Sequence, residues 1–113
     1  MYILRETIFW EHASRGIYSR HDTSWEYMRP GREQLRRTFA ETIRILRARV
    51  GLSQENLAHS ATLDRGYMGL LERGRSTPTL ETIFRLLAPL EIDFIQFATE
   101  FERVLQSRKR NKP

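Results

Sequence analysis

Residues 52–74, LSQENLAHSATLDRGYMGLLERG, decide the fold, because they carry the start and stop signals of two short helices in close succession. Ser53 can cap the first helix, Gln54 to Ser60, with its hydroxyl. Leu52 precedes that cap and Leu57 is the fourth helical residue, which is the spacing of a hydrophobic staple. This first helix is therefore predicted to be short and fixed at its entry.

The second helix follows after a connection of about three residues, Ala61 to Leu63. Asp64 can cap it, and Leu63 and Met68 repeat the staple spacing. Gly74 ends it in the manner of a C-terminal glycine. Two stapled helices on so short a turn are typical of a helix-turn-helix, in which the tight turn makes the helices cross steeply.

Three more helices surround this pair. Upstream, apolar residues recur at three- and four-residue steps up to the stop at Gly51: Leu35, Phe39, Ile43, Leu46 and Val50. Downstream, a helix begins at Pro78 or at a Thr79 cap, and Pro89 should kink or end it. Asp93 can cap a fifth helix, 94–105. No strand pattern competes after residue 31, so the prediction is an all-α domain of five helices.

Composition shifts divide the chain into three parts. Pro30-Gly31 marks the boundary between an N-terminal extension, 1–30, and the domain, 31–105. The extension is open to three interpretations: a helix packed on the domain, a mostly loose segment, or sequence upstream of a true start at Met28. Residues 106–113 are expected to form a basic, disordered tail.

The formal net charge of +5 is matched by the five basic and no acidic residues of 103–113. Within the domain the basic surplus lies in 31–75, with nine Arg against five acids. The terminal charges fit a solvated tail or an arm that touches phosphates. The absence of cysteine excludes disulfides and thiolate metal sites. No run of about 18 apolar residues could span a bilayer, and the start does not read as a signal peptide, so a soluble cytoplasmic protein is expected.

Landmarks along the central part of the chain carry a family resemblance. They are Ile43 with Arg47, Gly51-Leu52-Ser53-Gln54, Leu57-Ala58, Tyr67-Met68, Leu71-Glu72-Arg73-Gly74, Pro78, and Leu87 with Leu90. In this order and spacing they resemble the Cro and phage-repressor-like (XRE-type) helix-turn-helix regulators, over roughly residues 34–97. The resemblance implies a lambda-repressor-like fold whose second helix of the pair lies in the major groove of DNA.

The resemblance also implies which residues meet DNA. Arg65 would be the leading base reader, Leu70 could contact a thymine methyl, and the first helix would bind a phosphate. The full set implied is Gln54, Asp64, Arg65, Gly66, Tyr67, Leu70, Arg73, Arg75, Ser76 and Thr77. Glu72 is expected to form a structural ion pair with Arg47 rather than to act in catalysis.

Several of these positions have a plainer interpretation. Gln54 could be a solvated first-turn residue, and Arg65 could pair with nearby Asp64. Tyr67 could cover the helix pair, and Leu70 could belong to the edge of the core. The sequence departs from the family pattern at two points. Gly66 and Gly69 are expected to face DNA where many relatives carry side chains able to reach it, which thins the expected contact surface. Pro89 interrupts a position that is usually helical.

The sequence favours a transcriptional regulator that binds DNA as a homodimer, since a dimer doubles the contacts of a small reading head. The broad apolar stripe of helix 94–105 is the expected dimer seam, unless it packs on the N-terminal segment: Phe94, Phe97, Phe101, Val104 and Leu105. The alternative is an antitoxin-like or accessory module that binds a protein partner through the N-terminal segment or the tail. No catalytic constellation or cofactor motif has supporting context, and His12, His21 and His59 lack ligand-like spacing, so no enzyme, cofactor or metal is expected.

Overall fold

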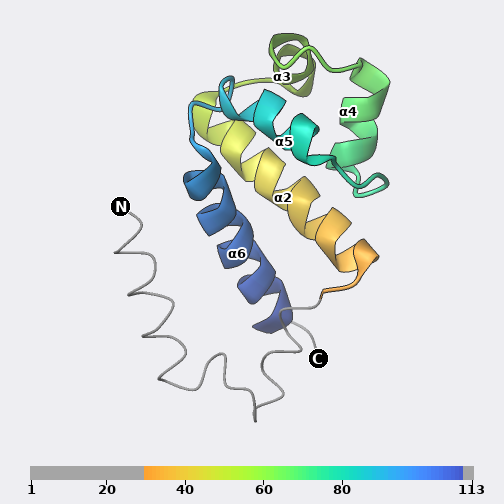
Figure 1. Ribbon diagram of the computed structural model, residues 1–113, viewed down its shortest axis with the longest axis vertical. Coiled ribbons are helices and arrows are strands. Elements are labelled where there is room, and N and C mark those ends of the chain that lie inside the picture. Colours follow the sequence, from red (N-terminus) through yellow and green to blue (C-terminus); the bar gives the residue numbers. More distant parts are fainter. Residues whose placement is uncertain (1–29, 111–113) are drawn as a thin grey trace. The chain divides into compact units, whose positions relative to one another are not determined.

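The computed structural model describes residues 30–110, so the expectations for 1–29 lie outside the described residues (Figure 1). The chain divides after Gly31, and the unit that begins at Arg32 is described below. Within residues 30–110 there are five α-helices and no strand, which confirms the predicted fold class. They are α2 (Arg32–Val50), α3 (Gln54–Ser60), α4 (Arg65–Glu72), α5 (Leu80–Leu87) and α6 (Phe94–Arg110).

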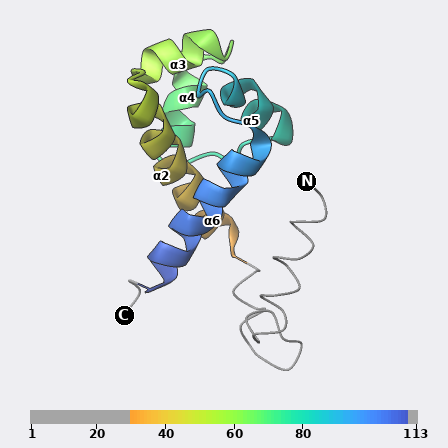
Figure 2. The ribbon, with the colours of Figure 1, turned by 90° about the vertical axis from the view of Figure 1, so that its left-hand side faces the viewer.

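The long helix α2 organises the domain. It packs most extensively against α6 and against α4, while α3 packs on α4 and α5 on α6 (Figures 1 and 2). The predicted pair thus lies at one end of the domain, with α4 packed on α2 and α3 packed on α4.

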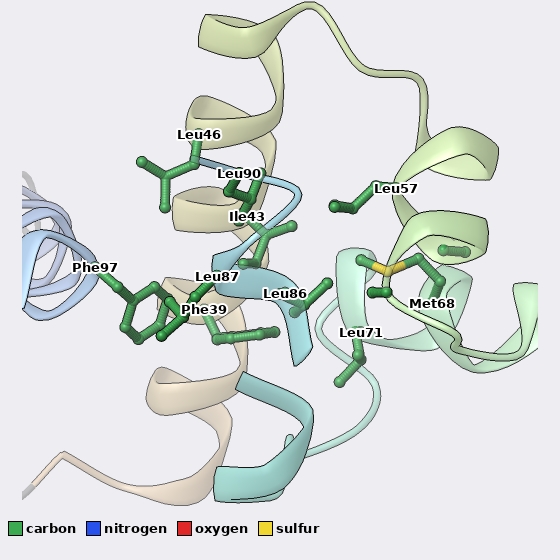
Figure 3. Close-up of a cluster of buried hydrophobic side chains, with 12 residues drawn as sticks. Phe39, Ile43, Leu46, Leu57, Met68, Leu71, Leu86, Leu87, Leu90 and Phe97 are labelled. Carbon is green, nitrogen blue, oxygen red and sulfur yellow. The ribbon is translucent and has the colours of Figure 1, made fainter. Parts of the chain in front are cut away.

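One hydrophobic core joins all five helices (Figure 3). Leu57, Met68 and Leu71 are completely buried, so α3 and α4 each contribute at least one anchor worth about 1.5–3 kcal/mol. The staple residues Leu52 and Leu63 are half-buried against the same cluster. The core consists of Phe39, Ile43, Leu46, Leu57, Ala58, Ala61, Met68, Leu71, Leu86, Leu87, Leu90 and Phe97.

The predicted caps are present at the starts of four helices. In each, the side chain of the cap accepts a hydrogen bond from the backbone N–H three residues later, which satisfies one of the orphan donors of the first turn. The bonds run from Asn56 to Ser53 (3.0 Å), from Tyr67 to Asp64 (3.1 Å), from Thr82 to Thr79 (3.0 Å) and from Gln96 to Asp93 (2.7 Å). The side-chain oxygen of Gln96 accepts a hydrogen bond from the Asp93 N–H at 2.9 Å, which completes a capping box.

The ends of α2 to α5 share one geometry. At each, a residue in the left-handed region is followed by a backbone bond back to the carbonyl five residues earlier, the Schellman motif. Gly51 and Gly74 occupy this position with φ of +70°. Thr62 and Glu91 occupy it with φ of 57° and 59°, although their side chains make this conformation costly. As expected, α5 ends at Leu87, before Pro89.

Helix α6 is longer than predicted. The boundary at 105 and the disorder expected from 106 were wrong for residues 106–110, which continue the helix. Gln and Arg favour helices as readily as they occur in solvated tails, so composition alone did not separate the two states. Arg108 anchors the extension by an ion pair with Glu41 on α2, at 2.8 Å.

Candidate nucleic-acid interface

The turn between α3 and α4 fixes how the two helices cross. Ala61 is buried beneath it, and Thr62 reverses the chain in the left-handed region. The Arg85 guanidinium on α5 donates a hydrogen bond to the Thr62 carbonyl at 3.2 Å. The turn is therefore held from below by the core and from the side by α5.

A buried ion pair connects α4 to α2. Arg47 donates from Nε and Nη2 to the two carboxylate oxygens of Glu72, each at 3.0 Å, as the predicted structural pair requires. Its Nη1 donates to the Leu52 carbonyl at 3.0 Å, so one side chain connects α2, α4 and the entry to α3. Arg44 donates to the Glu72 backbone carbonyl. Both carboxylate oxygens of Glu72 are engaged in these contacts, and the residue is buried inside the domain.

The exposed face of α4 is narrow. Arg65, Gly66 and Leu70 point outward, and Leu70 is 40% exposed. Tyr67 is half-buried, and its hydroxyl lies 3.3 Å from Oγ1 of Thr82 on α5. The ring of Tyr67 therefore packs against the core, in agreement with the interpretation in which this residue covers the helix pair.

Arg65, the expected base reader, forms an ion pair with a different residue from the one expected. Arg65 forms an ion pair with Glu55 on α3, not with Asp64, whose carboxylate caps α4. Both side chains of the pair are largely exposed, so the pair contributes little to stability and can open readily. Gln54, at the first position of α3, is half-buried. Among the residues expected to meet DNA, Asp64 fixes the amino-terminal end of α4 through its capping hydrogen bond.

The two glycines of α4 lie in different environments. Gly66 is exposed, as predicted, but Gly69 is buried, so the expectation that it opens the α4 backbone to DNA was wrong. A methyl group at Gly69 would lie 2.9 Å from Nη1 of Arg73, one helical turn further on. The missing side chain gives the Arg73 guanidinium room to lie over the helix.

The loop between α4 and α5 adds polar groups next to that face. Arg73, Arg75 and Thr77 are exposed and Ser76 is half-buried. Arg36 on α2 donates from Nε to the Thr77 hydroxyl at 2.7 Å. Arg36 is not among the contacts expected from the sequence, because on the helix pattern it is one more polar residue on the outer face of α2.

The predicted dimer seam is largely internal. Phe97, Val104 and Leu105 are buried in the chain and Phe101 is half-buried, so four of the five residues do not form a free surface. Only Phe94 is exposed, at 39%. Periodicity signals burial but does not distinguish a neighbour in the same chain from one in a second copy.

An exposed apolar patch is present instead where α5 meets α6. The rings of Phe84 and Phe94 are stacked, with centroids 5.1 Å apart and planes 8° from parallel. Leu80, one turn before Phe84, is exposed as well. Leu80, Phe84 and Phe94 are called the α5–α6 patch below.

In residues 30–110, no helix combines the length and the apolar character needed to cross a membrane. The same part of the chain holds no group of three or more acidic or histidine side chains arranged to hold a metal ion.

Comparison with known proteins gives the family. Residues 38–93 match the sequence model of a family described as "Helix-turn-helix domain". The controller protein C.AhdI of Aeromonas hydrophila is 39% identical over 55% of this chain and 94% of its own, with a TM-score of 0.52. The controller protein C.Esp1396I, solved as a tetramer with its natural 35 base-pair operator, is 25% identical over 64% of this chain and 95% of its own, with a TM-score of 0.60.

A curated relative, the "Neisseria hypothetical transcription factor" of Neisseria meningitidis, is 36% identical over 56% of this chain. The chain spans 36% and 59% of the lengths of the two curated relatives it matches. The chain belongs to the helix-turn-helix family of transcriptional regulators, as the sequence landmarks predicted. That family consists of DNA-binding regulators rather than enzymes.

Proposed function

We propose that this protein binds double-stranded DNA in a sequence-specific manner and regulates transcription, with α4 in the major groove. The observation that carries the proposal is the exposed Arg65 at the first position of α4. The Arg47–Glu72 pair fixes the helix that presents it from inside the domain. Helix-turn-helix proteins read bases with the amino-terminal residues of this helix. The operator complex of C.Esp1396I supports the same use of this fold.

Direct readout would rest on few groups. The Arg65 guanidinium can donate two parallel hydrogen bonds to O6 and N7 of a guanine once it leaves Glu55. Gly66 leaves the backbone bare beside it, which permits a close approach to the base edges. Leu70 can contact a thymine methyl group. A thin reading surface of this kind favours a short specific core within each site.

Phosphate contacts would position the domain around that core. Gln54 lies where α3 begins, and its amide can bond a backbone phosphate. Beyond α4, exposed arginines and a hydroxyl stand on the loop that follows the groove helix. The contacts proposed there are Arg73, Arg75, Ser76 and Thr77, with the Tyr67 hydroxyl at their edge.

We also propose that the protein acts as a homodimer through the α5–α6 patch. Phe84 is 53% exposed and stacks on the exposed Phe94, and contiguous apolar patches on a protein surface mark interaction sites. The tetrameric state of C.Esp1396I supports assembly of this fold with copies of itself. The full chain should have the mass of a dimer by light scattering. Phe84→Glu should lower that mass to one chain, while a wild-type monomer would contradict the dimer.

The decisive experiment on the function selects bound sequences from a random DNA pool and then compares variants. Arg65→Ala should cost about 1–3 kcal/mol, roughly 5–150-fold in affinity, on the selected site and little on random DNA. Arg103→Ala removes an exposed arginine from α6 and serves as the control. Equal losses on selected and random DNA would refute Arg65 as a base reader. Failure of the wild-type protein to enrich any sequence would refute specific binding.

The proposed cellular location follows from the DNA partner. Since the relatives that match are bacterial, and bacterial DNA lies in the cytoplasm, we place this function there. We expect no catalytic activity. The comparisons do not favour the protein-interaction module, and they offer no support for a protein partner bound through the N-terminal segment.

A further inference from the structure

Two segments 41 residues apart meet at the amino-terminal end of α2. There Arg36 on α2 donates its hydrogen bond to Thr77, in the loop between α4 and α5. A methyl group built on Gly74 would lie 3.5 Å from the Cα of Arg37, so the α2 backbone and the loop are in close contact. Between them is an open hollow of about 600 Å³. Its walls carry arginines from both segments.

Four of these arginines, Arg32, Arg36, Arg73 and Arg75, are called the arginine quartet here. Across the residues whose side chains are described, none of the four pairs with a carboxylate. The fifth arginine of the hollow, Arg37, pairs with Glu33 one turn earlier. The other described arginines, except Arg44 with its bond to a carbonyl, are all in ion pairs: Arg47, Arg49, Arg65, Arg85, Arg103 and Arg108.

Most of the arginine charge that pairs with no carboxylate among the described residues is thus gathered in one place. Like charges held close together repel one another in the free protein, and an anion that bridges them relieves the repulsion. Guanidinium groups suit phosphate in particular, because their planar forks can donate two parallel hydrogen bonds to it.

The position of the quartet points to its ligand. Arg73 and Arg75 belong to the loop that already has a place in the proposed DNA interface, and the hollow joins that loop directly to the first turns of α2. We propose that Arg32 and Arg36 form a second phosphate-binding segment, which extends the interface from the α4–α5 loop to the flanking DNA backbone. This inference rests on the proposed function, since its ligand is the backbone of the same bound duplex.

The segment would contribute affinity without sequence information. Each phosphate contact releases counterions and steepens the dependence of log Kobs on log salt concentration by about 0.9 on B-form DNA. Loss of two contacts should therefore flatten the slope by about 1.8. The ratio between selected and random DNA should stay unchanged, because phosphates carry no base identity.

The test measures binding by fluorescence anisotropy from 50 to 200 mM salt, on the selected duplex and on a random duplex of equal length. Arg32→Gln/Arg36→Gln removes both charges. Arg103→Gln/Arg108→Gln removes two charges from α6, away from the proposed interface, and serves as the control. Arg32→Gln alone is the second variant, because Arg32 is exposed and makes no side-chain hydrogen bond within the described residues.

The expected result is a slope flatter by about 1.8 for the double variant and by about 0.9 for Arg32→Gln, with the control at the wild-type value. A wild-type slope in both quartet variants, or an equal change in the control, would overturn the inference and leave the proposed function intact. A wild-type protein that binds neither duplex would overturn both. Circular dichroism of each variant verifies that the helices are retained.

Discussion

Loss of the Arg47 guanidinium should be among the most damaging single changes in the domain. Arg47→Met leaves the Glu72 carboxylate, whose side chain is 3% exposed, without its two hydrogen bonds of 3.0 Å. Removal of one partner of a buried ion pair costs about 3–5 kcal/mol, because the other charge stays in a poorly solvated place. A domain of about 80 residues is stable by roughly 4–12 kcal/mol, so this one change should remove a large part of its stability.

Urea unfolding at neutral pH, followed by circular dichroism, measures that loss. The double variant Arg47→Met/Glu72→Met fills the space with apolar atoms and should recover most of the stability, since neither charge is left alone. The exposed pair of Arg37 with Glu33 is the matched control, and Arg37→Met should cost less than about 1 kcal/mol. If Arg47→Met also cost less than 1 kcal/mol, or if the two single losses simply added, the buried pair would not be what holds α4 on α2.

Three further predictions concern individual side chains. Thr62→Gly should stabilise the domain by about 0.5–1 kcal/mol in urea unfolding, since it relieves a left-handed residue at a modest entropic cost; a loss would contradict that reasoning. The hydrogen bond from Arg103 lowers the pKa of the Glu100 carboxyl, so its contribution is present at neutral pH and lost as the pH falls through that lowered pKa; Glu100→Gln should flatten this acid dependence of thermal unfolding, and an unchanged profile would count against it. Glu55→Gln should tighten binding to the selected DNA a few-fold in anisotropy, because it releases Arg65 and removes a charge that repels phosphates, whereas weaker binding would mean that Glu55 orients the reader.

Local signals in the sequence were sufficient for most of the fold. The caps at Ser53, Asp64 and Asp93 depend on a side chain and a backbone N–H three residues away, so they are legible from the sequence alone. The same holds for the stops at Gly51 and Gly74, where only the tolerance of glycine for positive φ is needed.

What could not be predicted depends on contacts between distant segments. The pairing of Arg65 with Glu55 arises because the turn sets the start of α4 beside the first turn of α3, and no periodicity reports it. The bond between Arg36 and Thr77 requires the packing of α2 against the loop. The stripe of α6 was seen as apolar, but its coverage by α2 and α5 is a property of the tertiary structure.

The shared ending of α2 to α5 has a kinetic consequence. Each Schellman turn ends its helix within a few residues, so the connections between helices are short and most close contacts join residues near in sequence, with the packing of α2 on α4 and α6 as the exception. Proteins dominated by such local contacts fold in microseconds to milliseconds. We therefore expect the domain to refold within microseconds to milliseconds in stopped-flow or temperature-jump experiments. Glycine at Thr62 or Glu91, the two non-glycine residues with positive φ at these turns, should speed refolding.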